Sequence, residues 1–138
     1  NDSVFFGRRD FEVKDKKPMK RQDLLEQLAQ ILDEIQENIY SKALSFLKEH
    51  IHKIDSIEDF EKLFTRPSSS ASEKAFGGFA LCHWHPDAIG HSLLSKYKVT
   101  PRCIPLPNKE LGVGEPEEGK CLFTGKPSQI RVVFARSY

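Results

Sequence analysis

Apolar residues recur at intervals of three or four positions between Arg21 and about Ile51. The series runs through Leu24, Leu28, Ile31, Ile35, Ile39, Ala43 and Phe46, and acidic or basic side chains fill the other faces. This period predicts one long amphipathic helix. Thirty residues at about 1.5 Å each would reach about 45 Å, so such a helix is long enough to bridge two domains.

Shorter elements flank this helix. Val4-Phe5-Phe6 predicts a terminal strand within Ser3–Arg9, and Asp55-Ser56-Ile57-Glu58 has the composition of a helix start. Further along, the pattern predicts strands over 79–84, 99–106 and 130–135, a helix over 87–97 and a short hairpin before the last strand. The Ser-rich segment 65–74 is predicted to be a flexible loop.

This order of elements predicts an α+β protein: a long amphipathic linker helix followed by a small two-layer α/β domain with a mixed sheet. The predicted boundaries are 1–20 for the terminal strand, 21–54 for the linker helix and 55–138 for the domain. A chain of 138 residues with 38% hydrophobic content has room for one modest core with an appendage.

The overall charge carries no signal for nucleic acid, because 21 basic residues stand against 20 acidic ones. The charge is instead distributed unevenly: both ends of the chain are basic and the middle is acidic. Any RNA-binding surface is therefore expected to be local.

The three cysteines are an odd number and predict reduced thiols in a reducing compartment, for which the cytoplasm is the simplest choice. The longest apolar run is far too short to cross a bilayer and no signal peptide opens the chain, so a membrane role is not expected. The chain starts at Asn1 without an initiator Met, and we therefore expect a fragment of a larger parent protein.

Several short segments, in order and at compatible spacing, carry a family resemblance. They are Gly7-Arg8-Arg9-Asp10, Gly77-Gly78-Phe79-Ala80-Leu81, Thr100-Pro101-Arg102-Cys103-Ile104-Pro105, Glu117-Glu118-Gly119-Lys120-Cys121, Thr124-Gly125-Lys126-Pro127-Ser128 and Arg131-Val132-Val133-Phe134-Ala135-Arg136-Ser137-Tyr138. Together they cover nearly the whole chain, which resembles the C-terminal part of a prolyl-tRNA synthetase of the archaeal and eukaryotic type.

The resemblance implies that residues 1–20 complete an anticodon-binding domain and that residues 55–138 form the family's extra C-terminal domain. It also implies a parent enzyme that joins proline to its tRNA through an ATP-activated prolyl-adenylate, normally as a cytoplasmic homodimer. ATP and magnesium would bind outside this chain, because none of the ATP-binding motifs occurs in it.

The RNA-binding candidates are Lys14, Arg8 and Arg9. The family pattern places a lysine near the anticodon bases at the spacing of Lys14, and an ammonium group can donate to a base edge or a phosphate. Two alternatives stay open: Lys14 as a solvated surface lysine, and the arginines in salt bridges with the acidic flank of the long helix.

The resemblance also raises a metal question. Zinc-bearing relatives place four cysteines at positions that correspond here to His85, Gly90, Cys121 and Thr124. Only His85 and Cys121 can donate there, although His91 is close to the second position, and zinc needs a full ligand set. We therefore expect no zinc, with His85, His91 and Cys121 as the ligands if a metal does bind. The favoured alternative makes Cys82 and Cys103 small buried strand residues and leaves the histidines at the surface or hydrogen-bonded.

Tyr138 is the remaining candidate. The resemblance implies that its phenol and α-carboxylate point toward the catalytic domain and support the active site. The alternative is a frayed terminus.

Two functional interpretations follow. The first is a noncatalytic C-terminal part of a proline–tRNA ligase that supports anticodon binding and the active site. The second is an independent RNA-binding or zinc-ribbon-like interaction module. A standalone module should bury its own Val4-Phe5-Phe6 strand and the apolar face of its long helix, so the exposure of these residues separates the two.

Overall fold

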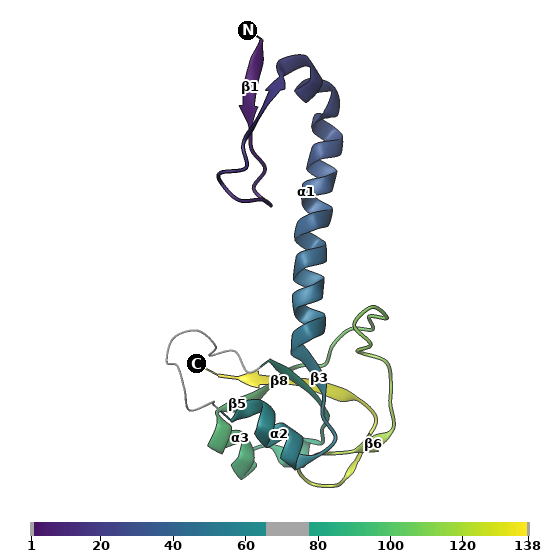
Figure 1. The fold of residues 1–138 in the computed structure, drawn as a ribbon. Helices are drawn as coiled ribbons and strands as arrows, with labels where there is room; N and C mark the ends of the chain where they lie inside the picture. Colours follow the sequence, from purple (N-terminus) through teal and green to yellow (C-terminus); the bar gives the residue numbers. More distant parts are fainter. Residues whose placement is uncertain (1, 66–77, 138) are drawn as a thin grey trace. The chain divides into compact units, whose positions relative to one another are not determined.

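The computed structural model describes residues 2–65 and 78–137, and the chain divides into two compact units, Asn1–Phe46 and Leu47–Tyr138 (Figure 1). The division falls inside the long helix. The predicted flexible loop at 65–74 lies almost entirely outside the described residues. Within the described ranges, no helix is both long and apolar enough to span a membrane.

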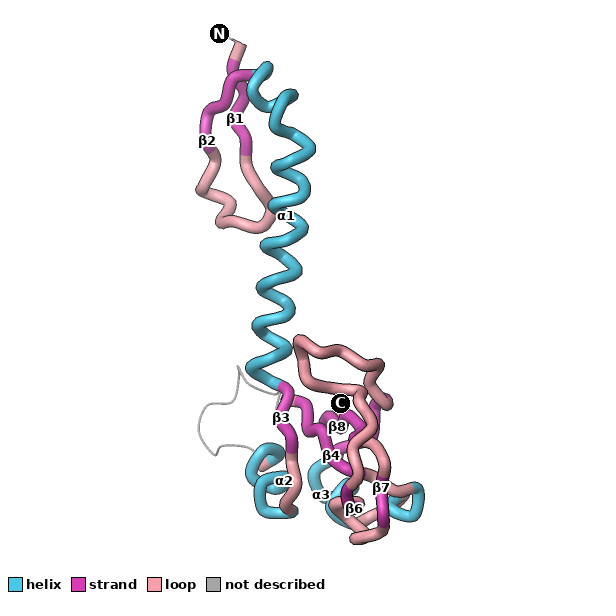
Figure 2. The backbone as a smooth tube through the Cα atoms, turned by 90° about the vertical axis from the view of Figure 1, so that its right-hand side faces the viewer, coloured by secondary structure: helices cyan, strands magenta, loops and turns pink. Residues whose placement is uncertain are grey.

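The first unit consists of a hairpin and most of a helix. Strands β1 (Ser3–Phe6) and β2 (Lys17–Lys20) pair antiparallel, and helix α1 (Arg21–His50) begins directly after β2. Figure 2 shows the hairpin beside the first half of α1, where Ile31 and Ile35 are buried. The predicted helix is confirmed almost to the residue.

The second unit is built on a four-stranded sheet. Its strands are β3 (Ile51–Lys53), β4 (Phe79–His83), β8 (Arg131–Arg136) and β5 (Val99–Cys103), in the spatial order β3-β4-β8-β5. The β3–β4 pair is parallel and the other two pairs are antiparallel. The sheet is therefore mixed, and the predicted α+β class is confirmed.

Helices α2 (Ile57–Phe64) and α3 (Ser92–Tyr97) contribute to the core on one face of this sheet. Side chains alternate along the strands, so Cys82 and Phe134 join the core that contains Phe60, which is fully buried. Burying one such phenylalanine contributes about 1.5–3 kcal/mol. The opposite face packs Leu81 and Val133 under Leu111 and Val113 of the connector that follows β5.

Two predicted elements differ from the structure. The helix expected over 87–97 is split into a 3₁₀ turn, η1 (Pro86–Ala88), and α3, because Gly90 between them has φ +79°. The strand expected over 99–106 ends at Cys103, since Pro105 and Pro107 offer no N–H to a ladder. The terminal strand predicted at Val4-Phe5-Phe6 is present as β1, which ends at Phe6, where the β1–β2 loop begins.

The expected short hairpin is present as β6 (Gly119–Lys120) and β7 (Pro127–Ser128). The expectation that Cys82 and Cys103 are both buried is half wrong: Cys82 is buried and Cys103 is exposed. Cys103 lies at the outer edge of the sheet, beyond a register shift that begins at Pro101.

Candidate functional site

The three predicted RNA contacts lie together in the loop of residues 7–16, which joins β1 to β2. Arg9 and Lys14 are exposed, and among the described residues their side chains form no ion pair. Two tight turns shape the loop, closed by hydrogen bonds from the N–H of Phe11 to Arg8 O and from the N–H of Asp15 to Glu12 O. The loop thus presents separate cations at a surface.

Arg8 differs from its neighbours because its donors are already engaged within the chain. Its guanidinium lies 2.9 Å from Asp10 Oδ2 and 2.7 Å from Glu34 Oε2, and it stacks on Phe11 at 4.7 Å. Hydrogen bonds to these two carboxylates raise the pKa of Arg8. The alternative salt bridge with the acidic flank of the helix is therefore present, and Arg8 is committed to the fold.

The candidate metal residues lie around the turn Cys121–Lys126. Burial works to raise the pKa of the Cys121 thiol, but hydrogen bonds from the Thr124 hydroxyl and from the N–H groups of Phe123, Thr124 and His85 outweigh it, so the pKa lies below its usual value. The polar groups of the turn thus favour the thiolate form more than burial disfavours it.

Both histidines use Nδ1 to accept hydrogen bonds from the backbone. His85 Nδ1 accepts from the N–H of Asp87 at 3.2 Å, and His91 Nδ1 accepts from the N–H of Leu93 at 3.4 Å. A neutral imidazole that accepts at Nδ1 carries its proton on Nε2. In the part of the chain that the structure describes, no three histidine, cysteine or acidic side chains converge as a metal site requires. The residues present therefore do not fit the four-ligand zinc site of the family.

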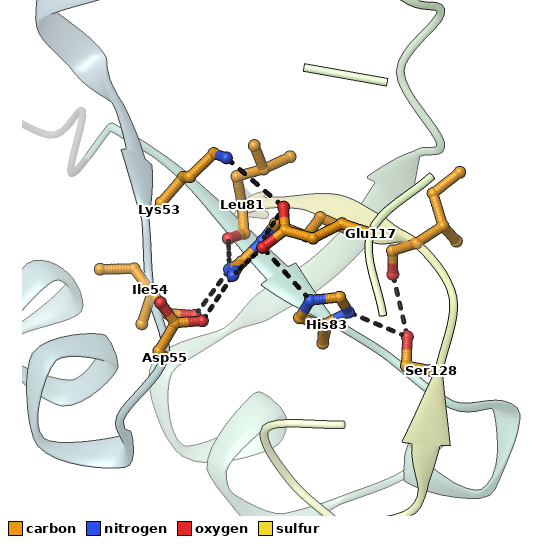
Figure 3. Close-up of polar contacts among 9 residues, drawn as sticks. Lys53, Ile54, Asp55, Leu81, His83, Glu117 and Ser128 are labelled. Carbon is orange, nitrogen blue, oxygen red and sulfur yellow. Dashed lines mark hydrogen bonds and ion pairs between the residues drawn. The ribbon is translucent and has the colours of Figure 1, made fainter. Parts of the chain in front are cut away.

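A third cluster was not predicted from the sequence: the buried guanidinium of Arg131 and the groups around it (Figure 3). Arg131 donates to both carboxylate oxygens of Glu117, at 3.0 and 2.8 Å, and its Nη2 lies 2.7 Å from Asp55 Oδ1. Its Nη1 donates to the carbonyl oxygens of Leu81 and Ile54. Charge-assisted hydrogen bonds thus tie β8 to β4, to the end of β3 and to the connector.

His83 lies on the other side of Glu117, with Nε2 3.7 Å from Oε1. Ser128 Oγ donates to Ile130 O, so the contact of 3.3 Å between His83 Nδ1 and Ser128 Oγ has the imidazole as donor. A serine whose proton points at a carbonyl and whose oxygen accepts from histidine is not arranged as a nucleophile. This cluster is a structural network.

One signal in the sequence points to this cluster. Arg131 opens an apolar strand, and a buried guanidinium needs a carboxylate, which the acidic connector at 112–119 supplies. The partner within that connector is Glu117. Its pKa is lowered to about 2, first by the hydrogen bonds from Arg131.

The last candidate, Tyr138, lies outside the described residues. The residues before it are held on both sides: the N–H of Ser137 donates to Lys98 O at 2.6 Å, and Arg102 Nη2 donates to Arg136 O at 2.6 Å. The Arg136 guanidinium in turn donates to Phe64 O. The strand is therefore anchored as far as Ser137.

Comparison with known proteins finds a family model that matches part of the second unit. The sequence model described as "Prolyl-tRNA synthetase, C-terminal" matches residues 72–138. These residues are similar to the C-terminal part of prolyl-tRNA synthetases. The resemblance that the motifs carried is confirmed at that level.

Similarity to individual proteins extends the match to the first unit. The chain is 39% identical over 98% of its length to proline–tRNA ligase from Bdellovibrio bacteriovorus, and 34% identical over 99% to that from Protochlamydia amoebophila. It covers 25% and 26% of these proteins, so it spans about a quarter of the length of the relatives it matches.

A solved prolyl-tRNA synthetase structure from Cryptosporidium parvum shares the fold. It superposes with a TM-score of 0.67 over 90% of this chain and 24% of the solved one, at 19% identity. At this identity the similarity is one of fold alone.

Proposed function

We propose that this chain is the C-terminal part of a proline–tRNA ligase, of the archaeal and eukaryotic type, that supports tRNA binding and the active site of its parent without performing catalysis. The observation that carries the proposal is the extent of the similarity. It runs across both units, and the relatives matched over 98–100% of the chain bear the name proline–tRNA ligase.

The exposure of apolar side chains in the first unit supports a larger parent over a standalone module. Phe5 is 79% exposed, and Leu25, Leu28, Leu32 and Ile39 lie on one side of α1 with 39–68% of each exposed. A contiguous apolar stripe of this kind marks a surface that another structure covers. The β1–β2 pair is also too small a sheet to be stable alone.

The contact with tRNA is assigned to the loop 7–16. Arg9 and Lys14 form no ion pair with any residue that the structure describes, and phosphate contacts from such cations supply much of the affinity for RNA. Arg8 is left out of this role because Asp10 and Glu34 already neutralise it.

The remaining properties belong to the parent enzyme. It would form prolyl-adenylate from ATP, with magnesium, at a site outside this chain, and would act as a homodimer in the cytoplasm. Tyr138 would support that site, and the anchoring of the strand as far as Ser137 is consistent with a terminus held in place.

The test uses the full-length protein and the isolated chain in parallel. Proline-dependent exchange of pyrophosphate into ATP and charging of proline tRNA are expected with the full-length protein and absent with the isolated chain, because specific carboxyl activation needs a preorganised site. Exchange by the isolated chain, or charging of another tRNA by the full-length protein, would overturn the proposal. Stable folding of the first unit alone with its stripe exposed would favour the independent module.

A further inference from the structure

Asp10 is a buried carboxylate in a basic, exposed loop. Its side chain has no solvent exposure, and its two oxygens accept hydrogen bonds from Arg8 Nε at 3.0 Å, Arg8 Nη2 at 2.9 Å and Asn38 Nδ2 at 2.7 Å. A carboxylate is removed from water at low cost only when it has such partners. The hydrogen bonds with Arg8 are the main cause that lowers the pKa of Asp10.

The donors to Asp10 come from two different elements. Arg8 belongs to the loop itself, whereas Asn38 belongs to α1. The ammonium of Lys42, one helical turn further, donates to the backbone oxygen of Asp10 at 2.7 Å, and Glu34, one turn earlier, accepts from Arg8. Residues four apart lie on one side of a helix, so positions 34, 38 and 42 form a single stripe that holds the loop.

This anchoring fixes the backbone on either side of Arg9. Arg8 and Asp10 are both hydrogen-bonded to α1, so the backbone of Arg9 between them is held in place. The Arg9 side chain stays exposed. A loop that is ordered before it binds loses less conformational entropy on binding. The cations of the loop are thereby preorganised.

We propose that Asp10 is a positioning residue for RNA: it locks the loop 7–16 onto α1 so that Arg9 and Lys14 meet the phosphates or bases of the tRNA. This rests on the proposed function, in which the loop contacts tRNA. Asp10 does not itself touch RNA, since its carboxylate is buried.

The sign of the effect separates positioning from simple electrostatics. Replacing Asp10 with Asn removes a negative charge next to the proposed site, and charge alone would make RNA binding tighter. If Asp10 positions the loop, Asp10→Asn should instead weaken binding. The matched control is Glu12→Gln, which removes an exposed acidic group from the same loop without touching the anchor.

The experiment measures the Kd of the full-length protein for a proline tRNA transcript at several salt concentrations. We expect Asp10→Asn to raise Kd on the order of tenfold and to flatten the salt dependence, as when one or two phosphate contacts are lost. Glu12→Gln should leave Kd unchanged or lower it. Asn38→Ala, which removes one donor and keeps the Arg8 pair, should weaken binding in the same direction by less, and it serves as the test if Asp10→Asn does not fold.

Three results would count against the inference. If folded Asp10→Asn or Asn38→Ala binds the tRNA as tightly as the unsubstituted full-length protein, or more tightly, Asp10 does not position the loop. If Asp10→Asn weakens binding with an unchanged salt slope, its role is structural only. If Arg9→Ala and Lys14→Ala both leave Kd and its salt slope unchanged, the RNA contact of the proposed function fails, and the inference fails with it.

Discussion

Arg131 and Glu117 face each other through two parallel hydrogen bonds, Nε to Oε2 at 3.0 Å and Nη2 to Oε1 at 2.8 Å. Only 9% of the Arg131 side chain is exposed. The pair joins the last strand of the sheet to a connector that has little regular structure of its own. Its removal should therefore affect the whole C-terminal unit.

Replacing Arg131 with Met should lower the free energy of unfolding by about 2–3 kcal/mol, because charge-assisted hydrogen bonds are lost and two carbonyl oxygens lose their donor. Chemical denaturation followed by circular dichroism measures the change. The control is Lys53→Met, whose ammonium lies 3.4 Å from Glu117 at an exposed position and should contribute less than about 1 kcal/mol. An Arg131→Met protein as stable as the parent would show that the network is dispensable.

The same pair predicts a dependence of stability on pH. Hydrogen bonds from Arg131 lower the pKa of Glu117 from 4.5 to about 2 in the folded protein. A lowered carboxyl pKa stabilises the fold above the unfolded value, and this contribution is lost as pH falls from about 4.5 toward about 2. Urea unfolding of the unsubstituted protein and of Glu117→Gln should be compared between pH 7 and pH 3. The difference in stability between the two proteins should shrink as the pH falls. A difference that is constant with pH would contradict the assignment.

Gly119 predicts a steric effect at His83. A Cβ at position 119 would lie 2.3 Å from His83 Nε2, and the imidazole is held by Ser128 on its other side. Gly119→Ala should cost about 1–3 kcal/mol through overpacking, measured by thermal unfolding. Lys120→Ala, at the adjacent exposed position, should change stability by less than about 0.5 kcal/mol.

The double variant His83→Ala with Gly119→Ala tests the cause. If the clash with the imidazole is responsible, the double variant should lose less stability than the sum of the losses in the two single variants, since each change relieves the other. Strict additivity would mean that Gly119 acts through its backbone and not through contact with His83.

The elements that sequence patterns predicted well are those that carry their own periodicity. Helix α1 shows a regular apolar repeat, and β4 and β8 are continuous apolar runs, so each could be placed from the sequence. Strands β2 and β3 have four and three residues and were not predicted. Segments this short become strands because a partner strand lies beside them, which a local pattern does not show.

The sites divide in the same way. Residue types and motifs drew attention to Lys14, Arg8 and Cys121. The hydrogen bonds that hold the loop 7–16 join positions far apart in the sequence. Arg8 and Glu34 are 26 residues apart, and Asp10 and Asn38 are 28 apart. A single sequence contains both partners of such a pair but no information on which of several carboxylates or amides the fold brings close.

The turn at Cys121 gives the last prediction, which concerns zinc. Burial raises the pKa of the Cys121 thiol, but hydrogen bonding from Thr124 and from the backbone of Phe123, Thr124 and His85 outweighs it and lowers that pKa. His85 and His91 use their Nδ1 atoms to accept from the backbone. The turn is closed by its own hydrogen bonds, from the N–H of Cys121 to Lys126 O and from the N–H of Gly125 to Cys121 O. A turn that is satisfied in this way does not need a metal to hold its shape.

Elemental analysis of the purified protein should accordingly find no stoichiometric zinc, and a chelator should leave its thermal unfolding unchanged. Thr124→Val should lower stability by about 0.5–1.5 kcal/mol, because the N–H of Lys126 loses the hydroxyl oxygen to which it donates at 3.4 Å. Thr124→Ser keeps the hydroxyl and should stay close to the unsubstituted protein. About one zinc per chain, lost in Cys121→Ala, would show that a metal holds this turn after all. Equal stability of the Val and Ser variants would mean that backbone hydrogen bonds hold the turn without the Thr124 hydroxyl. Thr124 would then not replace the fourth ligand of a zinc site.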